Sequence, residues 1–446
     1  MSDMHSVLFD DSLPRLAETI LRTLGEEALQ RGVALRDATG QLSFIVHEEC
    51  KSDVMRSELA QALSVALGPY ARPDRVLAFL NDAGAKQILE DPSRLPIKVN
   101  GVFCQLVDRR IVGTGWLDIP KSEIAIPPRI VFSSLKGGVG RSTALVVAAA
   151  DLARRNRNVL VVDLDLEAPG LRDLLLDDER MPQLGSVDYL VEAAISGSSD
   201  DLLRDMVGVS SLTKGGGGRV DVVPALGRKS TLYPENVLPK LARAMIETIT
   251  EESTISVGSQ ISSMIARLSA REAYDVILID SRAGLAELAA PAMLRLGATV
   301  LLFGTAQKQT IEGYRSLLTA LKLLAQRDRM EGRNADWRLM FKAVYAKASF
   351  NEDAAAAFRD DLYELFADGL YDEEQDGGNG DDDVTFPIDD QSAPHWPLVI
   401  PFNQSFIDFD PSRAPSHLTQ AFYEQTFRPF LDGLDGIIAS VHPEQP

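Results

Sequence analysis

The sequence predicts a doubly wound α/β domain with a mostly parallel sheet, preceded by a small α+β domain. Short β-branched runs recur from Arg129 onward, and helical stretches separate most of them, which is typical of a parallel sheet covered on both faces. Before that point, helix and hairpin patterns end in a linker punctuated by Pro120, Pro127 and Pro128. The length of 446 residues suits two or three domains. We therefore expect an α+β module over residues 1–125 and a larger domain over residues 126–446.

The elements of the first domain follow from apolar spacing and turn residues. Leu16, Ile20 and Leu24 give residues 13–30 helical periodicity. Asn100-Gly101 joins two short apolar runs and is a strong hairpin signal. The other predicted elements are strands at 33–35 and 42–46, a helix at 52–67, and strands at 97–99 and 102–107.

The second domain should contain seven strands, five of them clearly β-branched. The predicted strands are 130–132, 159–162, 220–223, 276–279, 299–303, 339–345 and 398–400. Two segments resemble insertions: the glycine-rich residues 214–219, and residues 371–390, which carry nine acidic and no basic side chains. We expect both to be surface loops, the acidic one solvated and mobile.

Composition excludes several classes of protein. With 45 basic and 65 acidic residues, the formal net charge is −20, which argues against wrapping of nucleic acid but leaves a small local patch open. Cys50 and Cys104 are too few for a disulfide scaffold or a thiolate metal cage. The acidic N-terminus shows no signal peptide, and no apolar run approaches the roughly 18 residues of a membrane span. We expect a cytoplasmic protein.

One glycine-rich segment carries the functional prediction. It directly follows the strand at 130–132 and opens a helix, and its residues are Lys136, Gly137, Gly138, Val139, Gly140, Arg141, Ser142 and Thr143. Such a turn directs backbone N–H groups to one point, and the positive end of the helix dipole adds to the same anion site. The hydroxyl of Ser142 stands where it would ligate a Mg²⁺ ion bound to nucleotide phosphates.

Carboxylates end two of the other predicted strands. Asp163 and Asp165 follow the strand at 159–162, and Asp280 follows the strand at 276–279. The carboxyl ends of neighbouring parallel strands converge on the crevice in which such sheets bind ligands. The glycine loop and these carboxylates together predict a nucleotide–metal site.

This combination resembles the deviant Walker A loop and the following aspartates of the ParA/MinD family of P-loop ATPases, over about residues 129–440. The resemblance implies ATP and Mg²⁺ as cofactors and a nucleotide-dependent homodimer. It implies that Lys136 reaches the partner's phosphates, that Asp165 positions the attacking water, and that Ser142, Asp163 and Asp280 form the metal environment. Residues 281–284 would be the switch that senses the γ-phosphate.

The sequence departs from the family pattern at several positions. Arg141 stands where the family usually has the second lysine of the loop, and its wide planar fork differs from a compact ammonium. Arg282 replaces a common proline of the switch, and Lys347 lies where an asparagine often reads adenine. Nucleotide binding should survive with slow hydrolysis, and Pro401 and Phe402 are expected to contact the base.

The expected function is an ATP-dependent switch that closes a homodimer and signals to a protein partner through residues 1–125. A nucleotide-stabilised scaffold without meaningful turnover and a DNA-partition ATPase are the alternatives. Residues 391–446 contain two basic residues, Arg413 and Arg428, so neither membrane binding nor DNA binding through this tail is expected.

Overall fold

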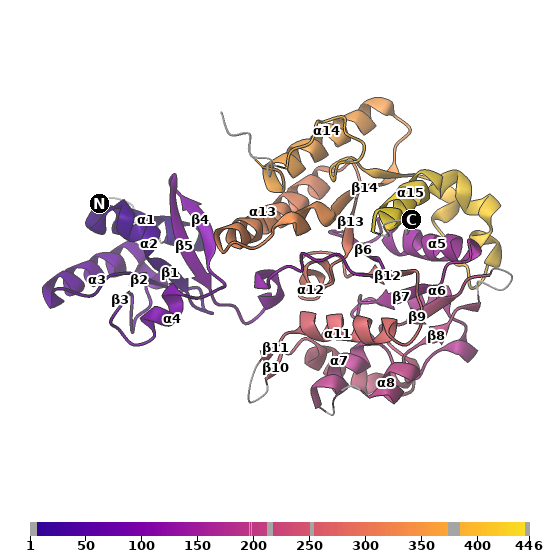
Figure 1. The fold of residues 1–446 in the computed structure, drawn as a ribbon, viewed down its shortest axis with the longest axis horizontal. Coiled ribbons are helices and arrows are strands. Elements are labelled where there is room, and N and C mark those ends of the chain that lie inside the picture. Colours follow the sequence, from indigo (N-terminus) through magenta and orange to yellow (C-terminus); the bar gives the residue numbers. More distant parts are fainter. Residues whose placement is uncertain are drawn as a thin grey trace. The chain divides into compact units, whose positions relative to one another are not determined.

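The computed structural model describes residues 7–195, 197, 199–211, 217–249, 254–372 and 384–441. Contacts between residues divide the chain into two compact units (Figure 1). Unit 1 consists of Met1–Leu117 and Leu323–Ala335, and unit 2 of Asp118–Lys322 and Asp336–Pro446. A short segment from the second half of the chain is therefore part of the N-terminal unit.

Unit 1 is a mixed five-stranded sheet with helices. Its elements are α1 (Phe9–Leu24), α2 (Glu26–Arg31), β1 (Val33–Arg36), β2 (Leu42–Val46), α3 (Asp53–Leu67), β3 (Leu77–Phe79), α4 (Ala85–Leu89), β4 (Leu95–Val99) and β5 (Val102–Asp108). The strand order is β3-β2-β1-β5-β4, in which β1 pairs antiparallel with β2 and parallel with β5. Helices α1 and α3 cover a core that includes Leu16, Phe44 and Leu63.

Most of the predictions for this unit are confirmed, including the helix at 52–67, which forms as α3, and one is wrong. The hairpin at Asn100-Gly101 forms between β4 and β5, and both turn residues have positive φ angles of 49° and 86°. The predicted strands at 33–35 and 42–46 pair as β1 and β2. The single helix expected over residues 13–30 is instead two helices, because Gly25 has a φ of 85° that no helix contains.

Unit 2 alternates strands and helices along most of its length. Its elements are β6 (Arg129–Ser134), α5 (Arg141–Arg154), β7 (Val159–Asp163), α6 (Leu171–Leu175), α7 (Ser186–Ile195), α8 (Asp200–Asp205), β8 (Gly208–Val209), β9 (Val220–Val223), α9 (Arg228–Leu232), α10 (Val237–Ala244), β10 (Thr248–Ile249), β11 (Thr254–Ile255), α11 (Val257–Ser269), β12 (Val276–Asp280), α12 (Ala289–Leu294), β13 (Thr299–Gly304), α13 (Lys308–Met330), β14 (Phe341–Ala348), α14 (Glu352–Gly369), β15 (Leu398–Pro401) and α15 (Gln420–Val441). The last residues of α13 belong to unit 1.

The large sheet confirms the predicted fold class. Its eight strands have the order β15-β14-β13-β6-β12-β7-β9-β8, and every pair is parallel except β8 with β9 at one edge. Every residue of β6, β7, β9 and β12 is buried, as expected for strands covered on both faces. Figure 1 shows α5 and α15 on one side of the sheet and α11 and α12 on the other.

The two expected insertions lie partly outside the described residues, which leave out 212–216 and 373–383. The first residues of the acidic segment pack against unit 2, whereas the sequence analysis expected the segment to be solvated. Tyr371 is buried, and the carboxylate of Asp372 accepts hydrogen bonds from both terminal nitrogens of the buried Arg338, at 2.9 and 2.7 Å. None of the helices described is long and apolar enough to cross a membrane.

Candidate nucleotide-binding site

The glycine loop lies between the end of β6 and the start of α5, as the sequence predicts. Gly138 and Gly140 have φ angles of 76° and 95°, in the left-handed region that favours glycine. A Cβ added to either residue would meet nothing within 4 Å, so the space in front of the loop is open. Helix α5 begins at Arg141, and its free N–H groups and dipole make this open space an anion site.

The sheet register brings two of the three predicted carboxylates side by side. Asp163 ends β7, Asp280 ends β12, and the two residues are direct neighbours in the parallel ladder. The backbone N–H of Leu164 donates to the carbonyl of Asp280 at 2.9 Å, which continues the pairing beyond the strands. The convergence of carboxylates at this edge is therefore a consequence of the strand pairing.

Arg141 connects two of the predicted carboxylates, Asp165 and Asp280. Its Nε donates to Asp280 Oδ1 at 2.5 Å, its Nη2 donates to Asp165 Oδ2 at 3.0 Å, and its Nη1 donates to the hydroxyl of Ser134 at 3.3 Å. The hydroxyl of Ser142 donates to the second oxygen of Asp280 at 2.7 Å. The side chains of Arg141, Asp165 and Asp280 are 9%, 10% and 3% exposed, so this is a buried charge network.

Burial and neighbouring charge shift the pKa values of this network. Burial lowers the pKa of Arg141, but the charges of Asp280 and Asp165 outweigh it and hold the pKa above its ordinary value. The pKa of Asp280 is raised by burial despite the opposing effect of Arg141. Burial and the charge of Asp280 raise the pKa of Asp163 well above its usual range. One guanidinium thus pairs with two carboxylates, those of Asp165 and Asp280, which leaves negative charge that a cation would compensate.

Asp163 and Asp165 differ in what they contact. The carboxylate of Asp163 accepts the backbone N–H groups of Asp165 at 3.0 Å and Leu171 at 3.3 Å, so both oxygens orient the chain after β7. Asp165 accepts the guanidinium of Arg141 with one oxygen and the N–H of Ala168 with the other. Of the predicted metal ligands, only Ser142 and Asp280 hydrogen-bond directly to each other.

The two basic side chains of the loop occupy opposite environments. Lys136 is exposed at the loop, and its backbone carbonyl accepts the hydroxyl of Ser134 at 3.1 Å. Arg141 is 8% exposed and points into the network of carboxylates. The loop therefore presents an ammonium to the outside and keeps a guanidinium inside.

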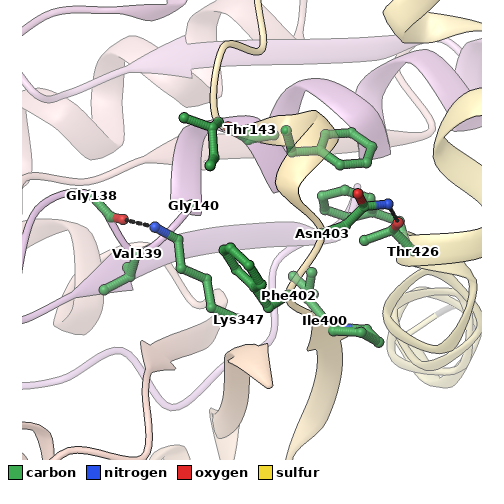
Figure 2. Close-up of a pocket in the computed structure, with 13 residues that line it drawn as sticks. Gly138, Val139, Gly140, Thr143, Lys347, Ile400, Phe402, Asn403 and Thr426 are labelled. Carbon is green, nitrogen blue, oxygen red and sulfur yellow. Dashed lines mark hydrogen bonds between the residues drawn. The ribbon is translucent and has the colours of Figure 1, made fainter. Parts of the chain in front are cut away.

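A cavity of about 290 Å³ opens beside the loop (Figure 2). It is lined by Gly138, Val139, Gly140, Thr143, Lys347, Ile400, Pro401, Phe402, Asn403, Phe406, Ile407, Thr426 and Phe427. Three phenylalanine rings give the cavity an apolar character. Pro401 and Phe402, which the sequence analysis expected to contact the nucleotide base, lie on its wall. A planar ring next to the phosphate-binding loop would find stacking partners here.

Lys347 connects strand β14, on the cavity wall, to the glycine loop. It is a non-glycine residue with a φ of 52°, and the pairing of β14 with β15 shifts register between Ala346 and Ala348. This bulge carries the side chain to the loop, where its Nζ donates to the carbonyl of Gly138 at 2.7 Å (Figure 2). The sequence singled out Lys347 only as a departure from a pattern, since nothing local indicates a contact with a residue 209 positions earlier.

The polar groups of the far wall are already engaged. Asn403 donates from its Nδ2 to the hydroxyl of Thr426 at 2.7 Å and accepts the N–H of Ser405 with its Oδ1 at 3.0 Å. Sequence reasoning named the turn at residues 401–403 but missed Thr426 and Phe427. Their signal is weak, because α15 contributes them only once it has packed against β15.

The residues at the loop fit a magnesium ion that takes most of its ligands from elsewhere. The described residues contain no group of three or more His, Cys, Asp or Glu side chains arranged to hold a metal. Ser142 and Asp280 supply one hydroxyl and one carboxylate, the hard oxygen donors that Mg²⁺ prefers. Mg²⁺ commonly keeps water ligands and binds through one or two protein groups together with nucleotide phosphates.

The chain was compared with solved structures and with curated proteins. Solved structures that match this chain include the ParA protein of pNOB8 (18% identity, TM-score 0.42, covering 70% of this chain and 96% of that one). They also include a variant of McdA from Cyanothece in complex with ATP (14%, 0.40, 73% and 100%) and the MinD cell division protein of Aquifex aeolicus (16%, 0.39, 69% and 97%). No curated protein sequence matches the chain.

A sequence model of one protein family matches residues 130–336, and its description is the CobQ/CobB/MinD/ParA nucleotide binding domain. The matched range contains the glycine loop, the start of α5 and the aspartates that end β7 and β12. This part of the chain therefore matches the nucleotide-binding domain of the CobQ/CobB/MinD/ParA family.

Proposed function

We propose that the protein is an ATP-dependent molecular switch that closes a homodimer around ATP and Mg²⁺ and signals this state to a protein partner. Nucleotide-dependent action follows from the family of residues 130–336. The choice of ATP, the dimer and the partner are the proposal. The observation that carries it is the opposite placement of the two basic side chains of the loop.

The exposed Lys136 supports the dimer. An ammonium that bound the phosphates of its own site would be expected inside the loop, where Arg141 lies instead. A cation at the rim can reach phosphates bound by a second copy of the chain. In a closed dimer it would neutralise phosphate charge that the interface would otherwise bury unpaired, at a cost of several kcal/mol.

The loop and its cavity divide the recognition of the nucleotide. The N–H groups of residues 137–143 and the N-terminus of α5 would bind the phosphates, and the cavity beside Phe402 would take the base. Ser142 and Asp280 would hold Mg²⁺, which shields phosphate charge when it is bound. Asp165 would then orient the attacking water.

Slow hydrolysis follows from the present partners of Arg141. Its guanidinium is bound by Asp165 and Asp280, and a group in two buried ion pairs is not free to stabilise a phosphate. The same contact keeps Asp165 from water. Phosphates must therefore compete for Arg141 before Asp165 can act, and a dimer or partner contact that favours this exchange would raise the rate.

Unit 1 is the proposed site for the partner. Residues 1–129 precede the matched family range, and Met1–Leu117 belong to a unit with its own sheet and core. A separately folded unit attached to a nucleotide switch is suited to read the state of that switch. In this role, unit 1 contributes no residue to phosphate binding or hydrolysis.

A nucleotide-stabilised scaffold without meaningful turnover is the second candidate. The same buried contacts of Arg141 favour it, since they occupy the residue proposed to orient water. The DNA-partition alternative has less support, because Arg428 of α15 pairs with Glu424 and lies 3.7 Å from Asp432. Such a helix face presents little free positive charge to phosphates.

Mass photometry with ADP, ATP and a non-hydrolysable ATP analogue, together with phosphate release, tests the switch. We expect monomers with ADP and dimers with ATP or the analogue. Lys136→Ala should bind ATP weakly and remain monomeric. A wild-type protein that is equally dimeric under all three conditions would exclude the switch and favour the scaffold.

A matched control is Lys51→Ala, which removes an ammonium whose side chain is 82% exposed in unit 1. This variant should dimerise with ATP like the wild type, because it lies outside the nucleotide-binding unit. Equal loss of the dimer in both variants would show that general surface charge, rather than the position of Lys136, controls association.

A further inference from the structure

Lys347 is a cation beside the glycine loop to which the proposed function gives no role. It is an exposed residue of β14, and its Nζ donates to the carbonyl of Gly138 at 2.7 Å (Figure 2). Among the described residues, this carbonyl is the one polar partner of the ammonium. Its charge therefore differs from that of Arg141, which is neutralised in two ion pairs.

The backbone at Lys347 is shaped for this contact. Its φ of 52° lies in the left-handed region, which residues with a Cβ rarely adopt. The register of β14 with β15 shifts between Ala346 and Ala348, so Lys347 is the extra residue of a bulge. Such costly conformations persist where the surrounding structure compensates for them, and they are frequent at functional sites. The bulge therefore indicates a role for the contact that it makes.

The carbonyl of Gly138 shares a planar peptide group with the N–H of Val139. In this trans peptide the C=O and N–H bonds point in opposite directions, so an ammonium that holds the carbonyl also fixes the direction of the N–H, away from Lys347. A Cβ built on Gly138 would meet nothing within 4 Å, and without a Cβ the peptide plane turns easily. The contact with Lys347 is what restrains it.

The N–H group restrained in this way is available to a ligand. Val139 is 6% exposed, and neither its N–H nor that of Gly140 has an acceptor among the described residues. Buried backbone donors are nearly always paired. A phosphate at the loop would accept from them, together with the N-terminus of α5. Lys347 thus acts, from the opposite side of the peptide, on a donor of the proposed phosphate site.

We propose that Lys347 is a positioning residue of the nucleotide site: its ammonium holds the peptide between Gly138 and Val139 so that the N–H of Val139 faces the phosphates. This inference rests on the proposed function and adds a residue to its site. An ammonium on the carbonyl also polarises the peptide group and makes the N–H a stronger donor. Arg141 cannot take this role while Asp165 and Asp280 bind it.

Calorimetry of the full chain with Mg²⁺ separates an action on the loop from a contact with the base. The two probes are ATP and inorganic tripolyphosphate, which has the phosphates without ribose or base. Lys347→Met removes the ammonium but keeps an unbranched side chain, so the backbone strain at this position is unchanged. We expect the affinity for both probes to fall by the same factor, about tenfold, equivalent to about 1.4 kcal/mol. Denaturant unfolding should be nearly the same as in the wild type.

Three further variants serve as controls. Gly140→Val should bind neither probe, which assigns tripolyphosphate binding to the loop. Lys347→Arg keeps a charged donor and should bind both probes more tightly than Lys347→Met. Lys322→Met is the matched control, because Nζ of Lys322 in α13 donates to the carbonyl of Asp368 at 2.9 Å, in the same unit but away from the cavity wall. It should bind both probes like the wild type.

Several outcomes would overturn the inference. A loss of affinity for ATP alone would show that Lys347 contacts the base, and an equal loss in Lys322→Met would show an effect of general charge. Unchanged affinity in Lys347→Met, or a wild type that binds ATP but not tripolyphosphate, would contradict a loop ordered for phosphate. A wild type that binds neither probe would also contradict the proposed function.

A crystal structure of the wild type with a non-hydrolysable ATP analogue checks the mechanism directly. Nζ of Lys347 should remain on the carbonyl of Gly138, with the N–H of Val139 donating to a phosphate oxygen. An ammonium that has left the carbonyl for a phosphate would overturn the positioning role.

Discussion

The two ends of the proposed nucleotide site are built in different ways. The phosphate end contains one buried guanidinium and three carboxylates, of which Asp163 and Asp280 are fixed by neighbouring strands. The base end is an apolar cavity whose ring Phe402 is 46% exposed. The hydrogen bond from Lys347 to the carbonyl of Gly138 connects the cavity wall of β14 to the loop.

This difference assigns the two ends different roles: the phosphate end sets the state of the switch, and the base end adds binding affinity. Buried charges interact strongly and in fixed directions, so exchanging the partners of Arg141 changes the free energy of the site by a large amount. Apolar contacts are weaker and less directional, so the base end contributes affinity without setting the state of the site. Substitutions at the phosphate end should therefore change binding or turnover strongly, and those at the base end only in degree.

The largest effect is expected for Gly140→Val. A branched side chain at a φ of 95° costs about 1–2 kcal/mol in backbone strain, and its Cβ would extend into the space that phosphate needs. We expect ATP binding to fall below detection by calorimetry while the protein stays folded. Binding as tight as in the wild type would contradict the assignment of the loop.

Gly101→Val is the matched control. Gly101 has a φ of 86°, and a Cβ there would also meet nothing within 4 Å, but it lies in the hairpin of unit 1. Both variants should lose similar stability in thermal denaturation. Only Gly140→Val should lose nucleotide binding, which separates backbone strain from the loss of the phosphate site.

The second effect concerns turnover and Arg141. A lysine at this position cannot bridge two carboxylates with a planar fork, so Arg141→Lys should release Asp165. We expect faster phosphate release, by up to about 100-fold if positioning limits the rate. Lower stability should accompany it, since the variant loses buried ion-pair geometry. An unchanged rate would show that Arg141 does not restrain the site.

Asp165→Ala tests whether Asp165 takes part in hydrolysis or only holds Arg141 in place. It also frees Arg141, but it removes the carboxylate proposed to orient water. Hydrolysis should disappear while the ATP-bound dimer persists in mass photometry. If Asp165→Ala hydrolyses ATP as fast as the wild type, another group orients the water.

The phosphate end could be predicted from the sequence because its determinants are local. Gly138 and Gly140 are part of one contiguous loop, and Asp163 and Asp280 directly follow β-branched strands whose parallel pairing is implied by the pattern. The inward orientation of the Arg141 side chain, toward Asp165 and Asp280, could not be predicted from the sequence. It depends on three elements, α5 and the ends of β7 and β12, that meet only in the folded domain.

The base end carries little local signal. The contact of Lys347 with the loop depends on a bulge between β14 and β15, and a bulge leaves no pattern in an apolar strand. Short edge strands were also missed: β3 and β8 contain three and two residues, too few for an alternation of apolar side chains. In unit 1, the helix break at Gly25 was missed because apolar spacing continues across it.

A smaller effect is expected at the base end from Phe402→Ala. Removing one aromatic wall should cost about 1–3 kcal/mol of binding free energy if the ring stacks on the base. The free energy of unfolding should change little, because the ring is about half exposed. Calorimetry with ATP measures the first quantity and denaturant unfolding the second. A complete loss of binding would contradict the division between the two ends.

The smallest effect is a pH dependence of stability that arises outside the base end, at the other end of β15. His395 lies just before β15; its Nδ1 faces the hydroxyl of Tyr371 at 2.7 Å and its Nε2 lies 3.1 Å from the carbonyl of Ile388. Burial lowers the pKa of this ring below its ordinary value. The unfolded chain therefore takes up a proton at higher pH than the folded chain, and stability should fall as pH drops below about 6.5, by at most about 1.4 kcal/mol per pH unit.

Denaturant unfolding between pH 7.5 and 5 measures this slope, and His395→Gln should flatten it. A slope of the opposite sign, or one that His395→Gln leaves unchanged, would show that other groups govern the acid response.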